Sequence, residues 1–224
     1  MTNSNDSTTR IFICGVGGLG TLTTAALVAK ASLHAGHPVV TGEIHGMSQR
    51  GGSVETSVIV GGAKSPLIAD GRADVFLGLE PLEALRYRAK IGPHTCVVVN
   101  TEPVVPVTVT MGGPDYPGPE KTTAVLSAQT ERLITFNATD LAAELGDERT
   151  ANTALIGAAF ELGVLPFDLD DIHHALDTTI PAQHCERNRA ALNAGRQITT
   201  DHSPPNTDHP PPNTDHPPPN TDHP

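Results

Sequence analysis

The segment that most constrains the fold is the glycine run GVGGLG, which directly follows the apolar stretch at 10–14. Its glycines are Gly15, Gly17, Gly18 and Gly20, and helical periodicity begins at its end. A short apolar run followed by G-x-G-x-x-G and a helix is typical of a phosphate-binding turn, where backbone N–H groups approach an anion. We predict that these four glycines line a binding site. Tight packing of strand against helix is the alternative, structural interpretation.

Apolar and turn-forming segments alternate along the chain in the order expected of an α/β fold. Strands are predicted at 10–14, 37–41, 54–60, 74–79, 95–99 and 133–136, and helices at 19–35, 80–91, 139–145, 150–162, from Asp168 onward and at 181–196. The first strand, helix and second strand form a βαβ unit. With five Phe, two Tyr and no Trp, the core must consist of Val, Leu, Ile and Ala, as in parallel sheets covered by helices. Residues 102–119, rich in proline and glycine, are predicted to form a long extended excursion.

Composition divides the chain into three parts. Residues 1–9 are polar and predicted to be flexible, residues 10–197 are long enough for one domain, and residues 203–224 repeat the unit PPNTDHP. The repeat has no apolar side chain to bury, so we predict a disordered tail with polyproline II character. It serves as a solvated spacer, or binds a divalent metal weakly through its recurring His and Asp.

The charge and the cysteines exclude several classes of function. A net charge of −11 repels nucleic acid and anionic lipid, so neither is an expected partner. No apolar run approaches the roughly 18 residues of a membrane span, and the first nine residues lack a signal sequence, which predicts a cytoplasmic protein. Cys14, Cys96 and Cys185 are far apart and form no C-x-x-C pair. The chain is therefore expected to hold neither a disulfide framework nor an iron–sulfur cluster, and no metal ligand or catalytic residue is assigned.

A second polar segment, GEIHGMSQRGGS at 42–53, replaces the helix expected after the second strand. Its candidate ligand-binding residues are Glu43, His45, Ser48, Gln49, Arg50, Gly51 and Gly52. Glu43 follows the second predicted strand, where a ribose-binding carboxylate is expected. Arg50 is suited to a carboxylate or phosphate, while His45 either relays protons or satisfies a carbonyl. Loops at the carboxyl ends of strands line one crevice, so we expect this segment to face the glycine run.

Five strings carry a resemblance to a known family: GVGGLG, GEIHGMSQRGGSV, DVFLGLEPLEALR at 74–86, Tyr116-Pro117 and NTALIGAAFELGVLP at 152–166. They resemble the gamma-domain family of the 2-oxoacid:ferredoxin oxidoreductases, over about residues 10–195. Leu19 and Ile59 depart from the family pattern, which has Gln and often Arg there. The resemblance implies a three-layer α/β/α fold with a Rossmann-like, mostly parallel sheet.

The resemblance also implies a role in a larger enzyme of the indolepyruvate type. Such an enzyme oxidatively decarboxylates an arylpyruvate to acyl-CoA and CO₂, with CoA as co-substrate and ferredoxin as electron acceptor. Thiamine diphosphate and the iron–sulfur clusters are expected in a larger alpha subunit. This chain would bind no cofactor by itself and would be inactive alone.

Two other functions remain open from the residues alone. The glycine run by itself indicates a stand-alone NAD(P)- or FAD-dependent dehydrogenase, and a nucleotide-sensing binding module is a third possibility. The segment after Glu43 favours the subunit, because a dinucleotide domain would continue with a helix and another βαβ unit. Glu80, Glu83 and Arg86 are predicted on an exposed helix face that shapes a subunit surface.

Overall fold

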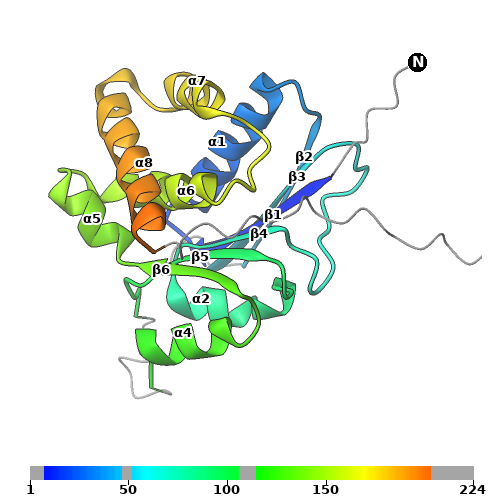
Figure 1. The fold of residues 1–224 in the computed structure, drawn as a ribbon, viewed down its shortest axis with the longest axis vertical. Helices are drawn as coiled ribbons and strands as arrows, with labels where there is room; N and C mark the ends of the chain where they lie inside the picture. Colours follow the sequence, from blue (N-terminus) through cyan, green and yellow to red (C-terminus); the bar gives the residue numbers. More distant parts are fainter. Residues whose placement is uncertain (1–7, 47–51, 106–114, 203–224) are drawn as a thin grey trace, which may run out of the picture.

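The computed structural model describes residues 8–46, 52–105 and 115–202. Six strands form one sheet: β1 (Thr9–Val16), β2 (Val39–His45), β3 (Ser53–Val60), β4 (Val75–Gly78), β5 (Cys96–Asn100) and β6 (Arg132–Phe136). The described helices are α1 (Thr21–His34), α2 (Pro81–Arg86), α4 (Pro119–Ser127), α5 (Ala138–Glu144), α6 (Ala151–Glu161), α7 (Leu169–Thr179) and α8 (Ala182–His202). The helices α1, α5, α6, α7 and α8 lie on one side of the sheet, and α2 and α4 lie on the other (Figure 1). The predicted three-layer α/β/α fold is confirmed.

The strand order is β2-β3-β1-β4-β5-β6. β1, β4, β5 and β6 pair in parallel, whereas β3 is antiparallel to both of its neighbours. β1 and β2 run in the same direction, as the predicted βαβ unit requires, but β3 lies between them. The short connection from β2 to β3 explains this, because a strand that returns through a short loop pairs antiparallel with its predecessor.

Several predicted boundaries were wrong. The second strand extends to His45, so Glu43 and His45 belong to a strand rather than to a loop. The predicted helix at 80–91 ends at Arg86, where Tyr87 leaves helical geometry and its ring approaches the ring of Phe12 at 5.5 Å between centroids. A 3-10 turn at Arg88–Lys90 follows.

Three helices differ from the prediction, in their presence, their N-cap or their end. α4 was not predicted, although Pro119 at its first position and Glu120 in its first turn are start signals. The cap of α5 is Asn137, whose side chain accepts from the N–H of Asp140 at 3.0 Å, instead of Thr139. α8 continues beyond the predicted end at 196.

The predicted cap of α7 is confirmed and forms a capping box. The Asp168 carboxylate accepts from the N–H of Asp171 at 3.1 Å, and the Asp171 carboxylate accepts from the N–H of Asp168 at 2.9 Å. The other oxygen of Asp171 lies 2.7 Å from Nδ1 of His34 on α1. One carboxylate therefore begins α7 and joins it to α1.

Alternate residues of β1 enter the two hydrophobic cores. Ile11 and Ile13 face the side of α1 and α6, while Phe12 faces α2 and stacks on Phe76, with ring centroids 5.5 Å apart. All four are at most 1% exposed. The central strand is thus buried on both faces, as a parallel sheet between helix layers requires.

α6 and α8 approach each other through two glycines. A Cβ at Gly157 would lie 2.1 Å from the carbonyl oxygen of Leu192, and a Cβ at Gly195 would lie 1.9 Å from that of Ala154. No real side chain fits at such distances, so this contact depends on glycine at both positions.

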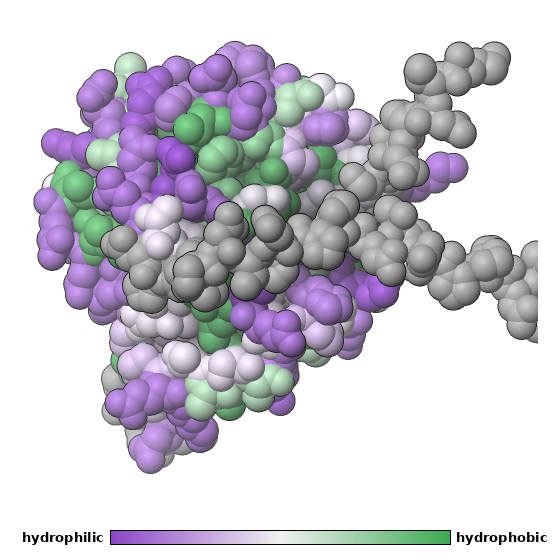
Figure 2. All heavy atoms as spheres, in the orientation of Figure 1, coloured by the Kyte–Doolittle hydropathy of each residue, from purple (hydrophilic) through white to green (hydrophobic). Residues whose placement is uncertain are grey.

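One face of the molecule is seen in a space-filling view. Figure 2 shows that hydrophilic side chains predominate on the viewed face, with separate apolar patches. No helix in the described ranges is long and apolar enough to cross a membrane. The predictions for residues 203–224, and for all but the end of the segment 1–9, lie outside the described residues; Thr9 already belongs to β1.

Candidate functional site

The glycine turn, residues 15–20, connects β1 to α1 at the carboxyl edge of the sheet. Gly18 and Gly20 have φ values of 106° and 82°, which side-chain-bearing residues rarely adopt. Gly20 occupies the N-cap position of α1, and since glycine has no side chain, no side-chain oxygen caps the helix there. The start of α1 therefore presents backbone N–H groups and the positive end of its dipole without a side-chain cap.

Two side chains that sequence reasoning missed lie at the glycine turn. Asn152 on α6 donates from Nδ2 to the carbonyl of Leu19 at 2.6 Å. Thr21, the first residue of α1, is 3% exposed, and its Oγ1 has no hydrogen-bond partner among the described residues. That hydroxyl lies close beneath Gly15, where a Cβ would be 3.2 Å away. An unpaired buried hydroxyl is uncommon and is available to a bound group or to water.

The two glycine-rich segments predicted to share a crevice do meet. The N–H of Gly17 donates to the carbonyl of Gly52 at 2.7 Å. The N–H of Gly46 donates to the carbonyl of Ser53 at 3.1 Å, which closes the β2–β3 connection at the same edge. Ser48, Gln49, Arg50 and Gly51 lie outside the described residues, so their predicted ligand contacts stay predictions.

Glu43 and His45 are not brought to the glycine turn. Both are exposed on β2, the edge strand, and β3 separates them from β1. In the strand register Glu43 pairs with Thr56 of β3, and Thr56 pairs with Ile13 of β1. Glu43 therefore lies two strand spacings, or roughly 10 Å, from β1. A ribose-binding carboxylate in a dinucleotide domain depends on the second strand lying beside the first, and this sheet lacks that arrangement.

Glu80 and Glu83 do not form the exposed surface that the sequence predicted. Glu80 is fully buried and Glu83 is 5% exposed. The Glu80 carboxylate accepts from the N–H of Glu83 at 2.8 Å, from the N–H of Val104 at 3.3 Å, and from the hydroxyl of Tyr116. Burial raises the pKa of Glu80 and also that of Tyr116, which therefore remains a donor. Glutamate followed by proline at the start of a helix was the signal available for this cap.

The remaining parallel strands end at the same edge. At the end of β5, Asn100 donates to Oγ1 of Thr139 at 3.0 Å and accepts from the N–H of Ala138 at 3.0 Å, which joins β5 to α5. Leu22 on α1 and Val105 after β5 are 47% and 46% exposed. The carboxyl edge of the sheet thus combines an anion-compatible helix start with exposed apolar side chains.

Comparison with known proteins places this geometry in a family. Residues 10–198 match the family described as Pyruvate ferredoxin/flavodoxin oxidoreductase. The chain belongs to this family. The predicted resemblance is thereby confirmed.

Named relatives cover the same part of the chain. The chain is 40% identical over 185 residues to "Indolepyruvate oxidoreductase subunit IorB" of Archaeoglobus fulgidus, covering 83% of this chain and 92% of that protein. It is 37% identical over 187 residues to the protein of the same name from Pyrococcus horikoshii, covering 83% and 93%. The gamma subunit of a keto/oxoacid ferredoxin oxidoreductase from Geobacter sulfurreducens PCA shares the fold, with a TM-score of 0.63, 23% identity, and coverage of 86% of this chain and 99% of that one.

The cysteines of this oxidoreductase family member do not suit a metal cluster. Cys14 and Cys96 lie on β1 and β5, with β4 between them, and Cys185 lies on α8; all three are buried. Burial raises the pKa of Cys14, and it raises that of Cys96 to about 11. These two thiols are therefore protonated at neutral pH, whereas the thiolate is the ligand and nucleophile. Within the described ranges, no three His, Cys, Asp or Glu side chains are grouped to hold a metal ion.

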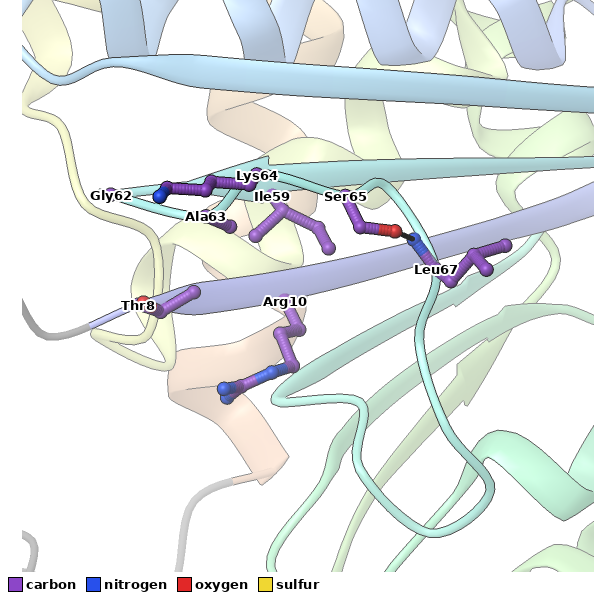
Figure 3. A pocket seen from close by; sticks show the side chains of 8 residues that line it. All are labelled: Thr8, Arg10, Ile59, Gly62, Ala63, Lys64, Ser65 and Leu67. Carbon is purple, nitrogen blue, oxygen red and sulfur yellow. Dashed lines mark hydrogen bonds between the residues drawn. The ribbon is translucent and has the colours of Figure 1, made fainter.

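A hollow of about 570 Å³ lies at the opposite end of β1 (Figure 3). Arg10 and Lys64 line it, and Arg10 pairs with Asp74 at 3.4 Å between Nη1 and Oδ2. Arg10 precedes Gly15 by five residues of strand, or roughly 16 Å. The hollow is therefore separate from the candidate site of this family member.

Proposed function

We propose that this chain is the subunit without thiamine or iron–sulfur centres in an indolepyruvate-type 2-oxoacid:ferredoxin oxidoreductase. The assembled enzyme would convert an arylpyruvate and CoA to acyl-CoA and CO₂, passing two electrons to ferredoxin. The observation that carries the proposal is identity of up to 40% to subunits named IorB, along more than nine-tenths of their length.

The candidate site supports a binding role for this chain. The uncapped start of α1, the left-handed Gly18 and Gly20, and the unpaired hydroxyl of Thr21 suit an anionic group at the glycine turn. CoA, the 2-oxo acid and an acidic side chain of the partner subunit all provide such a group. Gly15, Gly17 and Gly52 would shape the turn, and Arg50 would contribute a bidentate cation.

The chemistry of electron transfer would belong to the partner. Four thiolates hold each common iron–sulfur cluster, and this chain has three cysteines, all buried and on separate elements. A larger alpha subunit would therefore carry thiamine diphosphate and the clusters, and ferredoxin would meet the complex there. Leu22 and Val105, exposed at the carboxyl edge of the sheet, would face that subunit, and the complex would act in the cytoplasm.

Assembly tests the proposal directly. The chain is purified alone and together with the large subunit encoded by the same organism, and indolepyruvate-dependent, CoA-dependent reduction of a viologen dye is measured. We expect no activity and no visible absorption for the chain alone, and activity for the complex. Dye reduction by the chain alone, or stoichiometric binding of NAD(P) or FAD to it, would contradict the proposal and restore the dehydrogenase alternative.

A further inference from the structure

The glycine turn is connected to α2 by a chain of hydrogen bonds. Oγ of Ser53 donates to Oε2 of Glu83 at 2.5 Å, and the hydroxyl of Tyr87 lies 2.8 Å from the same Oγ. Burial raises the pKa of Tyr87, which is consistent with a hydroxyl that keeps its proton.

Ser53 is adjacent in sequence to Gly52, whose carbonyl joins the β2–β3 connection to the glycine turn. Its neighbour Gly52 accepts from the N–H of Gly17 at 2.7 Å, just beyond the last pair of the β1–β3 ladder, Val16 with Ser53. The end of a ladder opens more readily than its middle, because only one side of the terminal bond is supported by further pairing. The N–H of Gly46 supports Ser53 from the side of β2, and the side-chain bond from Ser53 to α2 adds a second support.

The acceptor of that bond is itself held in place. The Glu83 side chain is buried, and Nε of Arg86 lies 3.3 Å from the same Oε2. A buried carboxylate is costly unless charged or hydrogen-bonded partners compensate it, and Ser53 and Arg86 provide such partners. Glu83 belongs to α2, and Arg86 on the same helix contacts its carboxylate without taking part in the glycine turn.

We propose that Glu83 is a positioning residue for the glycine turn. Through Ser53 it holds the carbonyl of Gly52 against the N–H of Gly17, and so sets the shape of the turn that receives the anionic group. The consequence for turnover rests on the proposed function; the consequence for the Gly17 hydrogen bond does not.

The test compares Ser53→Ala with Ser53→Thr in the full chain, and Ser57→Ala is the matched control, because it removes a hydroxyl from the same strand farther from the turn. Amide hydrogen exchange at Gly17 is measured in the free chain by NMR. We expect roughly tenfold faster exchange in Ser53→Ala, the size of one hydrogen bond to a charged group, and no change in the other two variants. A folded Ser53→Ala chain with unchanged Gly17 exchange overturns the proposal.

A second variant covers the case in which Ser53→Ala folds poorly. Glu83→Gln keeps an oxygen acceptor but removes the charge, so a smaller acceleration of Gly17 exchange is expected than in Ser53→Ala. Gly17 exchange that is not accelerated in Glu83→Gln would overturn the proposal. In the assembled complex, KM for CoA or for the 2-oxo acid should rise severalfold in Ser53→Ala, with recovery in Ser53→Thr. Faster Gly17 exchange with unchanged KM and kcat supports the positioning role and contradicts the proposed binding function of the turn.

Discussion

Glu80 shows how one buried carboxylate organises the carboxyl edge of the sheet. It caps α2 and also receives bonds from Val104 and Tyr116, which flank the undescribed residues 106–114. Its folded pKa is raised above the ordinary value, mainly by burial. Such a group contributes stability fully below its unfolded pKa and loses that contribution as the pH rises through the folded pKa. At neutral pH the hydrogen bonds to Glu80 offset part of this cost.

Removal of the Tyr116 hydroxyl tests this balance. Tyr116→Phe takes one donor from a buried carboxylate and should lower the free energy of unfolding by about 2 kcal/mol at pH 7. The loss should shrink at pH 4, where a larger fraction of Glu80 is protonated and the bond to Tyr116 is worth less. Urea unfolding at the two pH values measures the difference. An equal loss at both would show that the cost arises from packing.

At the scale of elements, the α6–α8 contact leaves the least room for a side chain among the described glycine positions. Glycine within a helix usually weakens it, and replacement by alanine usually stabilises. At Gly157 and Gly195 the sign is reversed, because the added methyl group would overlap a backbone carbonyl of the other helix. Neither helix can move away from the other without disturbing the hydrophobic core that it covers.

Alanine at either glycine should therefore be severely destabilising. We expect Gly157→Ala and Gly195→Ala each to cost about 3 kcal/mol or more. Gly118→Ala is the control, since its φ is −62° and nothing lies within 4 Å of the added Cβ; its effect should stay within about 1 kcal/mol. Thermal melting of the three variants checks the order. A similar Tm for all three would mean that the helices separate easily.

The connection between α5 and α6, which contacts α8, contains an ion pair whose contribution to stability depends on pH. The Asp147 carboxylate accepts two bonds from the Arg149 guanidinium, each 2.8 Å long, and lies 3.8 Å from His184. The bonds from Arg149 lower the pKa of Asp147 to about 2. A lowered folded pKa gives stability that is present above the unfolded pKa and is lost as the pH falls through the folded value.

Asp147→Asn should consequently lower the Tm at pH 7 and have progressively less effect as the pH falls from 4 toward 2. Melting curves of the variant and the unaltered chain across this range provide the measurement. A Tm difference that stays constant over the range would assign the effect to the hydrogen bonds of Asp147 and exclude its charge.

At the scale of the whole molecule, we predict that residues 203–224 take no part in folding or assembly. Nothing apolar in residues 203–224 offsets the entropy of ordering their backbone. Deletion of these residues should therefore leave the Tm and the assembly of the complex unchanged. Size-exclusion chromatography of the complex with the shortened chain measures the second property. Loss of the large subunit would identify the tail as a binding segment.

The fold was largely predictable, because buried strands and helix periodicity are local patterns. Five predicted strands lie within two residues of the observed bounds, and the cap at Asp168 is where its side chain indicated. The strand order was not predictable from these patterns, since the residues of β3 are compatible with a strand in any position of the sheet. Its insertion beside β1 is what moves Glu43 away from the glycine turn.

The candidate site was predictable only in part. The meeting of Gly17 with Gly52 followed from the rule that loops gather at the carboxyl ends of strands. The burial of Glu80 and Glu83 did not, because their partners Ser53 and Tyr116 are about thirty residues away in the chain. A charged helix face indicates exposure until such distant partners are known.

The two glycines between α6 and α8 also have a consequence for how the gene can change. Every single-nucleotide missense change of a glycine codon yields a residue with a Cβ atom, so no one-step substitution at Gly157 or Gly195 avoids the carbonyl that each faces. Compensation would require the opposing helix to withdraw, which a change in one side chain does not achieve. Random mutagenesis of the gene, with selection for an unaltered Tm, should therefore recover missense changes throughout the exposed face of α8 and none at these two codons.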